Sequence, residues 1–436
     1  MIQKRLADLS KPIRVGIAGA GEFSLEMVTQ IGYIKNMEVS AIGDISPDAA
    51  VQAFKAAGYG GEQIVVAKSV SQAKSCMDMG KRVVFEDGLA LCELPVDAVC
   101  DVTGDPCFGA EFGYRAIENG KHTIVVNIES DVVVGPILKR LADSAGVVYT
   151  EGDGDQPSLI KGLYDWADVL GLDVTVAGKW TTVRPEEFYN EGGKRSDIGY
   201  NDGSKNQVEM CCVANMTGFV PDITGMHKPS LKLADIVSTF ALKENGGILG
   251  RDGVIDVVNC VSPDGGSVVE PLLGGGVFII IRSENPQVHH AIRHKGFLGS
   301  ADKKSALIYR PYHFVGIETP MSILKAVLYN EPTGAMLPTP VADVISVAKK
   351  DLQPGEVLDG IGGMTVRGVV ERADAAKRKN LLPLGLAEKV RVKSFVPKGA
   401  ELTYDMLEKD GGTFIWKLRK LQDSVAAGRA TGKGLL

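Results

Sequence analysis

The feature that most constrains the fold is a strand pattern that ends in two closely spaced glycines and continues into a helix pattern. Residues 13–19 form a short run rich in β-branched residues that ends in Gly19, and Gly21 follows just before the helix pattern begins. A second strand pattern, 39–44, ends in Asp44, 23 residues after Gly21. This combination is typical of a domain that binds a dinucleotide.

The two glycines have separate roles in such a turn. The first allows a tight turn, and the second lets the backbone approach a diphosphate at the helix N-terminus, where amide groups favour an anion. The residues expected to contact the cofactor here are Gly19, Ala20, Gly21, Glu22 and Phe23. Asp44 is expected to accept hydrogen bonds from the ribose 2′-hydroxyl and to repel a 2′-phosphate, so charge alone favours NAD over NADP. The alternative is that Asp44 is a turn residue that faces solvent.

Strand and helix patterns alternate through the first 150 residues. Strands are expected at 13–19, 39–44, 64–66, 82–85, 98–104 and 123–127, with helices between several of them. The alternation predicts an α/β dinucleotide-binding domain over 1–150 with a doubly wound parallel sheet. Thr103 and Gly104 end one strand, and we expect them near the nicotinamide. Asn127 ends the next strand and is expected to contact the ribose of the cofactor or the substrate. The alternative is a structural role in strand-to-helix turns.

The pattern changes twice after residue 150. Residues 151–337 are expected to form a central α+β catalytic and oligomerisation domain, whose helix at 320–330 can return to the first domain. Residues 338–436 contain Pro, Gly and short β-branched runs, which predict a small β-rich domain followed by a basic, partly ordered tail from residue 413.

Composition and cysteine spacing exclude several classes of protein. The net charge is −6 without a long basic run, which argues against nucleic acid as a partner. No apolar run approaches the roughly 20 residues of a membrane span, and the N-terminus lacks the apolar segment of a secretory signal. The seven cysteines form no Cys-x-x-Cys pair, as expected in a reducing compartment. We therefore expect a cytoplasmic protein that acts on small molecules.

Three acids alternate in the turn at 151–155. Glu151, Asp153 and Asp155 place repelling carboxylates close together, and a divalent cation such as Mg²⁺ or Mn²⁺ would relieve the repulsion through hard oxygen ligands. A catalytic role for at least one of them is a second possibility. A third is helix capping, because Asp155 precedes a predicted helix and negative charge is favoured at a helix N-terminus.

A polar, glycine-rich stretch at 189–205 is expected to be a long loop. Its donors could surround a phosphate or a carboxylate, with lysine as a point charge and arginine as a bidentate partner. These donors are Lys194, Arg195, Asn201, Ser204 and Lys205. The alternative is a solvated loop in which Lys205 pairs with Glu209. Lys179, at the end of a strand pattern, is a candidate proton donor to a carbonyl under reduction, or else a lysine at the sheet rim.

Parts of the chain resemble homoserine dehydrogenases. The resemblance to their dinucleotide domain lies in DVTGDP (101–106), GKH (120–122) and VVN (125–127). The resemblance to the start of their catalytic domain lies in EGDGDQP (151–157) and AGK (177–179). The chain departs from that family at Ile128, where the family has a lysine after the asparagine. The resemblance implies a Rossmann-type domain followed by an α+β catalytic domain.

The C-terminal part resembles a SAF domain, a β-clip module. The similar segments are AKKDLQPGE (348–356), LPLGL (382–386) and VPKGAELT (396–403). A Rossmann-type domain, a homoserine-dehydrogenase-like middle and a terminal SAF domain together resemble the DXR-like (DRL) reductoisomerases. That resemblance covers nearly the whole chain.

The DRL resemblance implies an oxidoreductase of isoprenoid precursor synthesis in the MEP pathway. It converts 1-deoxy-D-xylulose 5-phosphate to 2-C-methyl-D-erythritol 4-phosphate by a metal-assisted rearrangement and hydride transfer from NADPH, and it is a homodimer. NADH stays possible because of Asp44. The residues assigned on this basis are Glu151, Asp153 and Glu209 to the metal, Lys179, Glu151, Asp155 and Lys205 to catalysis, and Lys194, Arg195, Asn201, Ser204 and Lys205 to the phosphorylated sugar.

Two other functions remain open from the sequence. One is an NAD(P)-dependent dehydrogenase of a small hydroxy or sugar acid, which needs neither a rearrangement nor a metal. The other is a nucleotide-binding sensor or scaffold that uses the SAF-like part to contact a ligand or partner.

Overall fold

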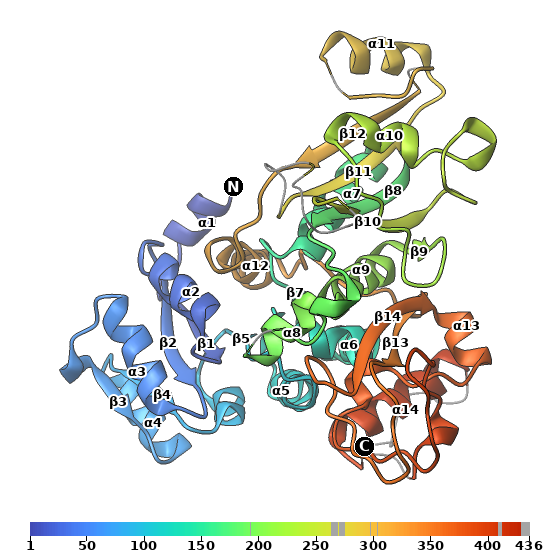
Figure 1. The fold of residues 1–436 in the computed structure, drawn as a ribbon. Coiled ribbons are helices and arrows are strands. Elements are labelled where there is room, and N and C mark those ends of the chain that lie inside the picture. The colour runs from blue at the N-terminus through green and yellow to red at the C-terminus, as the bar shows by residue number, and fades with distance from the viewer. Residues whose placement is uncertain are drawn as a thin grey trace. The chain divides into compact units, whose positions relative to one another are not determined.

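The computed structural model describes residues 1–191, 193–262, 269, 275–296, 298–302, 304–408 and 412–428 (Figure 1). The chain forms two compact units. The first unit comprises Met1–Ser158, Phe314–Pro338 and Thr413–Leu436, and the second unit comprises Leu159–His313 and Thr339–Gly412. This division differs from three consecutive domains, because the chain comes back to the first unit after each part of the second. Residues 409–411 and 429–436 of the expected C-terminal domain and tail lie outside the described residues.

A seven-stranded parallel sheet is the centre of the first unit, in the order β3-β4-β2-β1-β5-β6-β7. The strands are β1 (Ile13–Ala18), β2 (Met37–Gly43), β3 (Ile64–Val66), β4 (Arg82–Phe85), β5 (Ala98–Asp101), β6 (His122–Val125) and β7 (Tyr149–Glu151). Strands β2–β4 lie on one side of β1 and β5–β7 on the other. The strand order therefore reverses between β1 and β5, and the predicted doubly wound parallel sheet is confirmed.

Helices cover both faces of this sheet. They are α1 (Ile2–Ala7), α2 (Glu22–Gly32), α3 (Pro47–Ala56), α4 (Val70–Asp78), α5 (Pro106–Glu118), α6 (Ile128–Ala145), α12 (Val315–Tyr329) and α14 (Phe414–Ala426). Apolar residues of α2, α3 and α12 share one core cluster with the sheet, whereas those of α4 and α5 share another. Phe54 and Phe112 are fully buried in these two clusters, one on each face. Burial of such a side chain contributes roughly 1.5–3 kcal/mol.

The sequence patterns did not predict α6, because it contains a proline. Pro136 lies inside the helix, where a missing N–H normally interrupts the backbone hydrogen bonds. The side chain of Gln422, on α14, satisfies backbone groups next to this proline. Its Oε1 accepts a hydrogen bond from Ile137 N–H at 3.2 Å, and its Nε2 donates one to the Val133 carbonyl at 3.1 Å. The expected basic, partly ordered tail is thus a helix that completes another helix of the same unit.

The second unit has a mixed five-stranded sheet in the order β12-β11-β8-β10-β9. Its strands are β8 (Asp173–Thr181), β9 (Val220–Pro221), β10 (Val254–Asn259), β11 (Val277–Arg282) and β12 (Ser305–Arg310). Helices of this unit include α7 (Gln156–Val169), which begins in the first unit, α10 (Ile236–Thr239) and α11 (Pro286–His294). Trp180 and Phe278 are fully buried and their rings lie 4.7 Å apart, so they anchor the core on one face of the sheet.

Two further helices occupy the region expected to be one long loop. Helix α8 covers Arg195–Asn201, and α9 begins at Ser204 and ends at Thr217. Polar and apolar side chains of α9 are buried on all sides, so the sequence shows no amphipathic period. The expectation of a continuous polar loop over 189–205 is therefore wrong after residue 194.

The β-rich part, residues 339–412, belongs to the second unit. It contains the antiparallel pair β13 (Ala342–Ala348) and β14 (Val366–Arg372), followed by α13 (Ala373–Arg378). Polar groups of α9 hold both strands. Ser204 Oγ accepts from Gly368 N–H at 2.8 Å, Gln207 Oε1 from Val370 N–H at 2.9 Å, and Asn215 Oδ1 from Val341 N–H at 2.8 Å. Within the described ranges, no helix combines the length and hydrophobicity needed to cross a membrane.

Candidate functional site

The turn after β1 has the geometry that its two glycines predict. Gly19 has φ +103°, and a Cβ there would lie 3.0 Å from Val102 Cγ2 and 3.3 Å from the Val102 backbone, so only glycine fits. Gly21 precedes the first residue of α2, and a Cβ there would meet nothing within 4 Å. The backbone at the start of this helix therefore borders open space, as an anion-binding helix N-terminus requires.

Asp44 lies directly beside that turn. Its Oδ2 accepts a hydrogen bond from Ala20 N–H at 2.7 Å, and its Oδ1 accepts one from Ser46 N–H at 2.7 Å. The carboxylate therefore joins the glycine turn to the start of α3, which differs from the alternative of a residue that only faces solvent. A carboxylate at the end of the second strand is also where a ribose diol is bound in dinucleotide domains.

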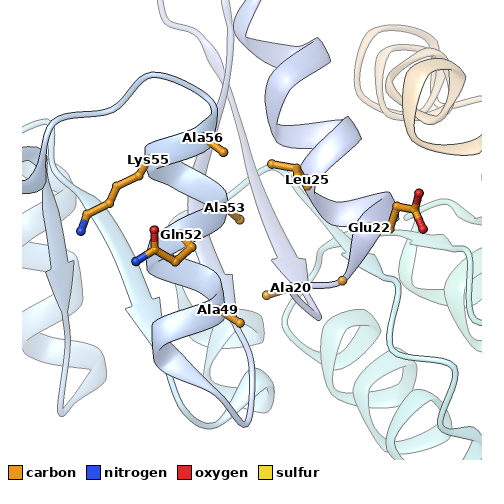
Figure 2. Close-up of a pocket in the computed structure, with 9 residues that line it drawn as sticks. Ala20, Glu22, Leu25, Ala49, Gln52, Ala53, Lys55 and Ala56 are labelled. Carbon is orange, nitrogen blue, oxygen red and sulfur yellow. The ribbon is translucent and has the colours of Figure 1, made fainter. Parts of the chain in front are cut away.

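A pocket of about 640 Å³ opens between α2 and α3 next to the glycine turn. Figure 2 shows that α3 presents Ala49, Ala53 and Ala56 toward α2, while the Lys55 side chain extends away from α2. The predicted cofactor residues Ala20, Gly21 and Glu22 line this pocket. Phe23 is not among its lining residues, and its side chain is 45% exposed.

The ends of β5 and β6 carry a buried polar cluster around Asp101. Asp101 Oδ1 accepts from Thr103 N–H at 3.0 Å and from Thr103 Oγ1 at 2.7 Å, and Asp101 Oδ2 accepts from Asn127 Nδ2 at 2.9 Å. Burial raises the pKa of Asp101 to about 6, although these hydrogen bonds offset part of the rise. Gly109 packs so closely here that a Cβ would lie 2.7 Å or less from Asp101 and Asn127.

This cluster unites two of the predicted cofactor residues and adds a third group. Asn127 Nδ2 also donates to Thr103 Oγ1 at 3.1 Å, and Gly104 follows with φ +72°. Sequence reasoning selected Thr103, Gly104 and Asn127 but missed Asp101, which looked like one more residue of an apolar strand. Its position as the last residue of β5 was the available signal.

The three acids of the turn after β7 have three different environments. Glu151 ends β7 and is fully buried. Asp153 N–H donates to Ser322 Oγ at 2.6 Å, and its carboxylate lies 3.8 Å from Lys325 Nζ. Asp155 Oδ1 accepts from Gln156 N–H, the first residue of α7, at 2.8 Å. Asp155 is therefore in contact with the first residue of α7, as the capping alternative expects.

A second acid missed from the sequence lies close to Glu151. Carboxylate oxygens of Asp131, on α6, and Glu151 lie within 4.8 Å of each other. Burial raises the pKa of Asp131 to about 6, while its contacts with Glu151 and Tyr149 oppose the rise. Two buried carboxylates at this spacing have the hard oxygen donors that Mg²⁺ or Mn²⁺ prefers. Asp131 with Glu151 therefore fits a divalent cation within the first unit.

In the second unit, Lys179 and Glu209 form a buried ion pair. Lys179 Nζ, near the end of β8, donates to Glu209 Oε2 on α9. The two side chains are 4% and 7% exposed. Lys179 is therefore not a lysine at the solvent-facing rim, and the predicted pairing of Lys205 with Glu209 is replaced by this one. Because Lys179 neutralises Glu209, we no longer assign that carboxylate to a metal.

The residues predicted to hold a phosphate are mostly engaged elsewhere. Lys194 and Arg195 are exposed, and Arg195 pairs with Glu388 at 3.4 Å. Asn201 Nδ2 donates a hydrogen bond to the Glu191 carbonyl at 2.6 Å. Ser204 is fully buried, and its hydroxyl oxygen accepts a hydrogen bond from the Gly368 N–H of β14. Lys205 is half-buried at the start of α9. Asn201 and Ser204 therefore have structural partners within the second unit, and their role at a phosphate stays a prediction.

A lysine from the β-rich part holds this region in place. Lys349 Nζ donates to Asp202 Oδ2 at 3.0 Å, to the Tyr189 carbonyl at 3.1 Å and to the Gly363 carbonyl at 2.9 Å. Burial raises the pKa of Asp202, and the Lys349 charge opposes that rise. All three protons of the ammonium are used, so Lys349 acts as a clamp between the β-rich part and the segment before α9. Nothing in the local sequence indicated this pairing.

Comparison with known proteins bears on the middle of the chain. Residues 154–319 match a family model described as the catalytic domain of oxidoreductase DRL. The comparison with curated proteins gives no match.

Several solved structures are distantly similar to the chain. A probable dehydrogenase from Thermotoga maritima is 15% identical, with 74% of this chain and 91% of that one covered and a TM-score of 0.39. Scyllo-inositol dehydrogenase from Lactobacillus casei is 16% identical, with 75% and 92% covered and a TM-score of 0.38. A 3-ketoreductase from Actinomadura kijaniata is 17% identical, with 73% and 90% covered and a TM-score of 0.37. The match to the family model is the more informative finding, and it makes residues 154–319 similar to an oxidoreductase catalytic domain, that of DRL.

Proposed function

We propose that this chain is an NAD(P)H-dependent reductoisomerase that converts 1-deoxy-D-xylulose 5-phosphate to 2-C-methyl-D-erythritol 4-phosphate. One observation carries the proposal: the match of residues 154–319 to the DRL catalytic domain follows a parallel sheet with a dinucleotide-type glycine turn. A hydride donor and a catalytic domain of an oxidoreductase family are the two parts that such a reaction needs.

The first unit supplies the cofactor site in this proposal. Gly19 and Gly21 leave room for a diphosphate at the start of α2, and Asp44 offers a carboxylate to the adenosine ribose. The family resemblance favours NADPH, whereas the charge of Asp44 favours NADH. The buried Asp101–Asn127 cluster fixes the chain where β5 and β6 end, which is the part of the sheet expected to face the nicotinamide.

The proton for the new hydroxyl comes from Lys179 in this proposal. Hydride reduction of a carbonyl places an electron pair on oxygen, and an ammonium within hydrogen-bond distance can transfer a proton to it. Glu209 holds the Lys179 ammonium in one position before the transfer. The pair is buried, so bulk water does not compete for the proton.

Glu151 and Asp131 are the groups that would hold a divalent cation. When bound, such an ion polarises the substrate carbonyl. The two residues keep their carboxylates together inside the first unit, in a place where water does not screen their charge. Asp153 and Asp155 are already engaged by Ser322, Lys325 and the start of α7, so we leave them out of the metal site.

An NADPH-oxidation assay tests the proposal. The full chain is mixed with deoxyxylulose phosphate and followed by loss of NADPH absorbance, with Mg²⁺, with EDTA and with NADH in place of NADPH. We expect turnover that EDTA abolishes and Mg²⁺ restores. Lys179→Met should abolish this turnover, whereas the control variant Lys139→Met, whose half-buried lysine pairs with Asp143, should retain it. Absence of turnover with both reduced cofactors overturns the proposal. Metal-independent turnover of a hydroxy or sugar acid would instead identify a simple dehydrogenase.

A further inference from the structure

A strained segment of the second unit presents a lysine, Lys228, that has no ion pair among the described residues. Met226 and Lys228 have φ values of +67° and +54°, a backbone conformation that residues other than glycine rarely adopt. Such strain persists only where the surrounding structure enforces it, and it concentrates at functional sites. His227 lies between the two strained residues.

Two buried acids enforce the strained conformation. Asp256 on β10 is fully buried and accepts from His227 N–H at 3.0 Å and from Lys228 N–H at 2.9 Å. Asp222 Oδ2 lies 2.8 Å from His227 Nε2. Asp256 therefore fixes the backbone of this segment, and Asp222 fixes the imidazole of His227. Neither one pairs with the Lys228 ammonium, because no carboxylate of the described residues lies within ion-pair distance of it.

A second cation without an acid partner lies on the neighbouring strand. The segment before Lys228 runs along β14, since Gly225 N–H donates to the Val370 carbonyl at 2.8 Å and Thr224 Oγ1 to Glu371 at 2.9 Å. Arg367 is on the same strand, and its guanidinium lies 5.5 Å from the centre of the Tyr189 ring. Among the described residues, Arg367 also has no carboxylate in ion-pair distance.

The charge of Arg367 acts unfavourably on the Lys228 ammonium. Burial lowers the pKa of Lys228, the Arg367 charge lowers it further, and Asp256 opposes both effects. Both side chains are half-buried, where an uncompensated charge is costly. The folded state therefore carries an unfavourable electrostatic free energy at these two cations, and a bound anion would lower it.

We propose that Lys228 and Arg367 form an anion subsite that takes the phosphate monoester of the substrate. A phosphate dianion matches two positive charges, whereas a carboxylate would leave one of them uncompensated. Arginine can bind two phosphate oxygens with its planar fork, and lysine can bind a third as a point charge. The proposal rests on the proposed function for the identity of the phosphorylated compound, and it replaces the loop donors around Asn201 and Ser204.

The subsite is tested by direct binding of inorganic phosphate to the full chain, measured by titration calorimetry without turnover. The variants are Lys228→Asn, because asparagine tolerates the same backbone conformation without the charge, and Arg367→Gln. Lys232→Asn is the matched control, since Lys232 is exposed four residues further along. We expect each site variant to weaken phosphate binding by about tenfold or more, as lost charged hydrogen bonds require, and the control to leave it unchanged.

Cofactor titrations and kinetics separate the possible outcomes. NADH affinity should be the same in all variants, and the KM for deoxyxylulose phosphate should rise about tenfold or more in Lys228→Asn with a smaller change in kcat. Unchanged phosphate affinity in both site variants overturns the subsite, even if the enzyme turns over. Displacement of phosphate by NADPH but not by NADH also overturns it, because the site would then bind the cofactor. Weakened phosphate binding in a chain that never turns over deoxyxylulose phosphate supports the subsite and rejects the proposed function.

Discussion

Replacing Lys179 by methionine should destabilise the protein because it leaves Glu209 as an unpaired charge in the interior. The two side chains are only 4% and 7% exposed, so solvent cannot take over the role of the lysine. Removing one partner of a buried pair costs about 3–5 kcal/mol, whereas replacing both by apolar residues of similar size is often neutral or stabilising. We therefore expect Lys179→Met to lose about 3–5 kcal/mol of unfolding free energy, and Lys179→Met with Glu209→Leu to lose less than either single variant.

Urea denaturation of the full chain measures these free energies. The control is Lys139→Met, because Lys139 pairs with Asp143 at 2.6 Å within one helix, and their side chains are 20% and 61% exposed. An i,i+4 pair open to solvent contributes at most about 0.5 kcal/mol. Turnover is measured in the same variants. The double variant should fold well and yet have no activity, which separates the proton donor role from stability.

Two results would contradict this reasoning. If the double variant loses the sum of the two single losses, Lys179 and Glu209 do not interact and the buried pair is not a unit. If the double variant keeps its turnover, Lys179 does not supply the proton, whatever its effect on folding.

Three further predictions concern the first unit. Gly19→Ala should lose about 1–2 kcal/mol of unfolding free energy, because φ of Gly19 is +103° and Val102 lies in contact with it. Gly21→Ala should keep its stability and lose cofactor binding, because a Cβ there meets no protein atom. Urea denaturation measures the stability and NADH titration measures the binding. Asp44→Asn should raise the kcat/KM ratio of NADPH over NADH about tenfold, because the carboxylate that repels a 2′-phosphate is gone, and a ratio that stays constant would place Asp44 outside the ribose site. Asp101 binds its proton more tightly in the folded state, where its pKa is about 6, than in the unfolded chain, where it is 3.8. The unfolding free energy of the wild type, compared with that of Asp101→Asn, should therefore fall by up to about 3 kcal/mol as the pH rises from 4 to above 6. Parallel pH dependences of the two proteins would contradict this.

The parallel sheet could be predicted because its strands carry local signals. Most of the short β-branched runs end at a glycine or an acid, and the helix patterns lie between them. Helices α6 and α9 could not be predicted in the same way. Pro136 conceals α6, and the complete burial of α9 removes the contrast between a polar and an apolar face.

The candidate site was predictable residue by residue but not as a set of pairs. Lys179 and Glu209 were both selected, but 30 residues separate them and only the packing of β8 against α9 joins them. Lys349 lies 147 residues beyond Asp202, and the signal for that pair is absent from either local sequence. Local sequence patterns indicate which residues have suitable functional groups, whereas the tertiary structure determines which of those residues are in contact.

The contact of Gln422 with α6 has a consequence for biosynthesis. Every strand of the parallel sheet has been synthesised once residue 151 is made, yet the amide that fills the break at Pro136 is encoded about 270 residues later. Until then, the Val133 carbonyl and the Ile137 N–H lack their native partner in a buried position. The nascent first unit should therefore remain an unfinished, chaperone-dependent intermediate through most of translation, and truncation before α14 should trap it there.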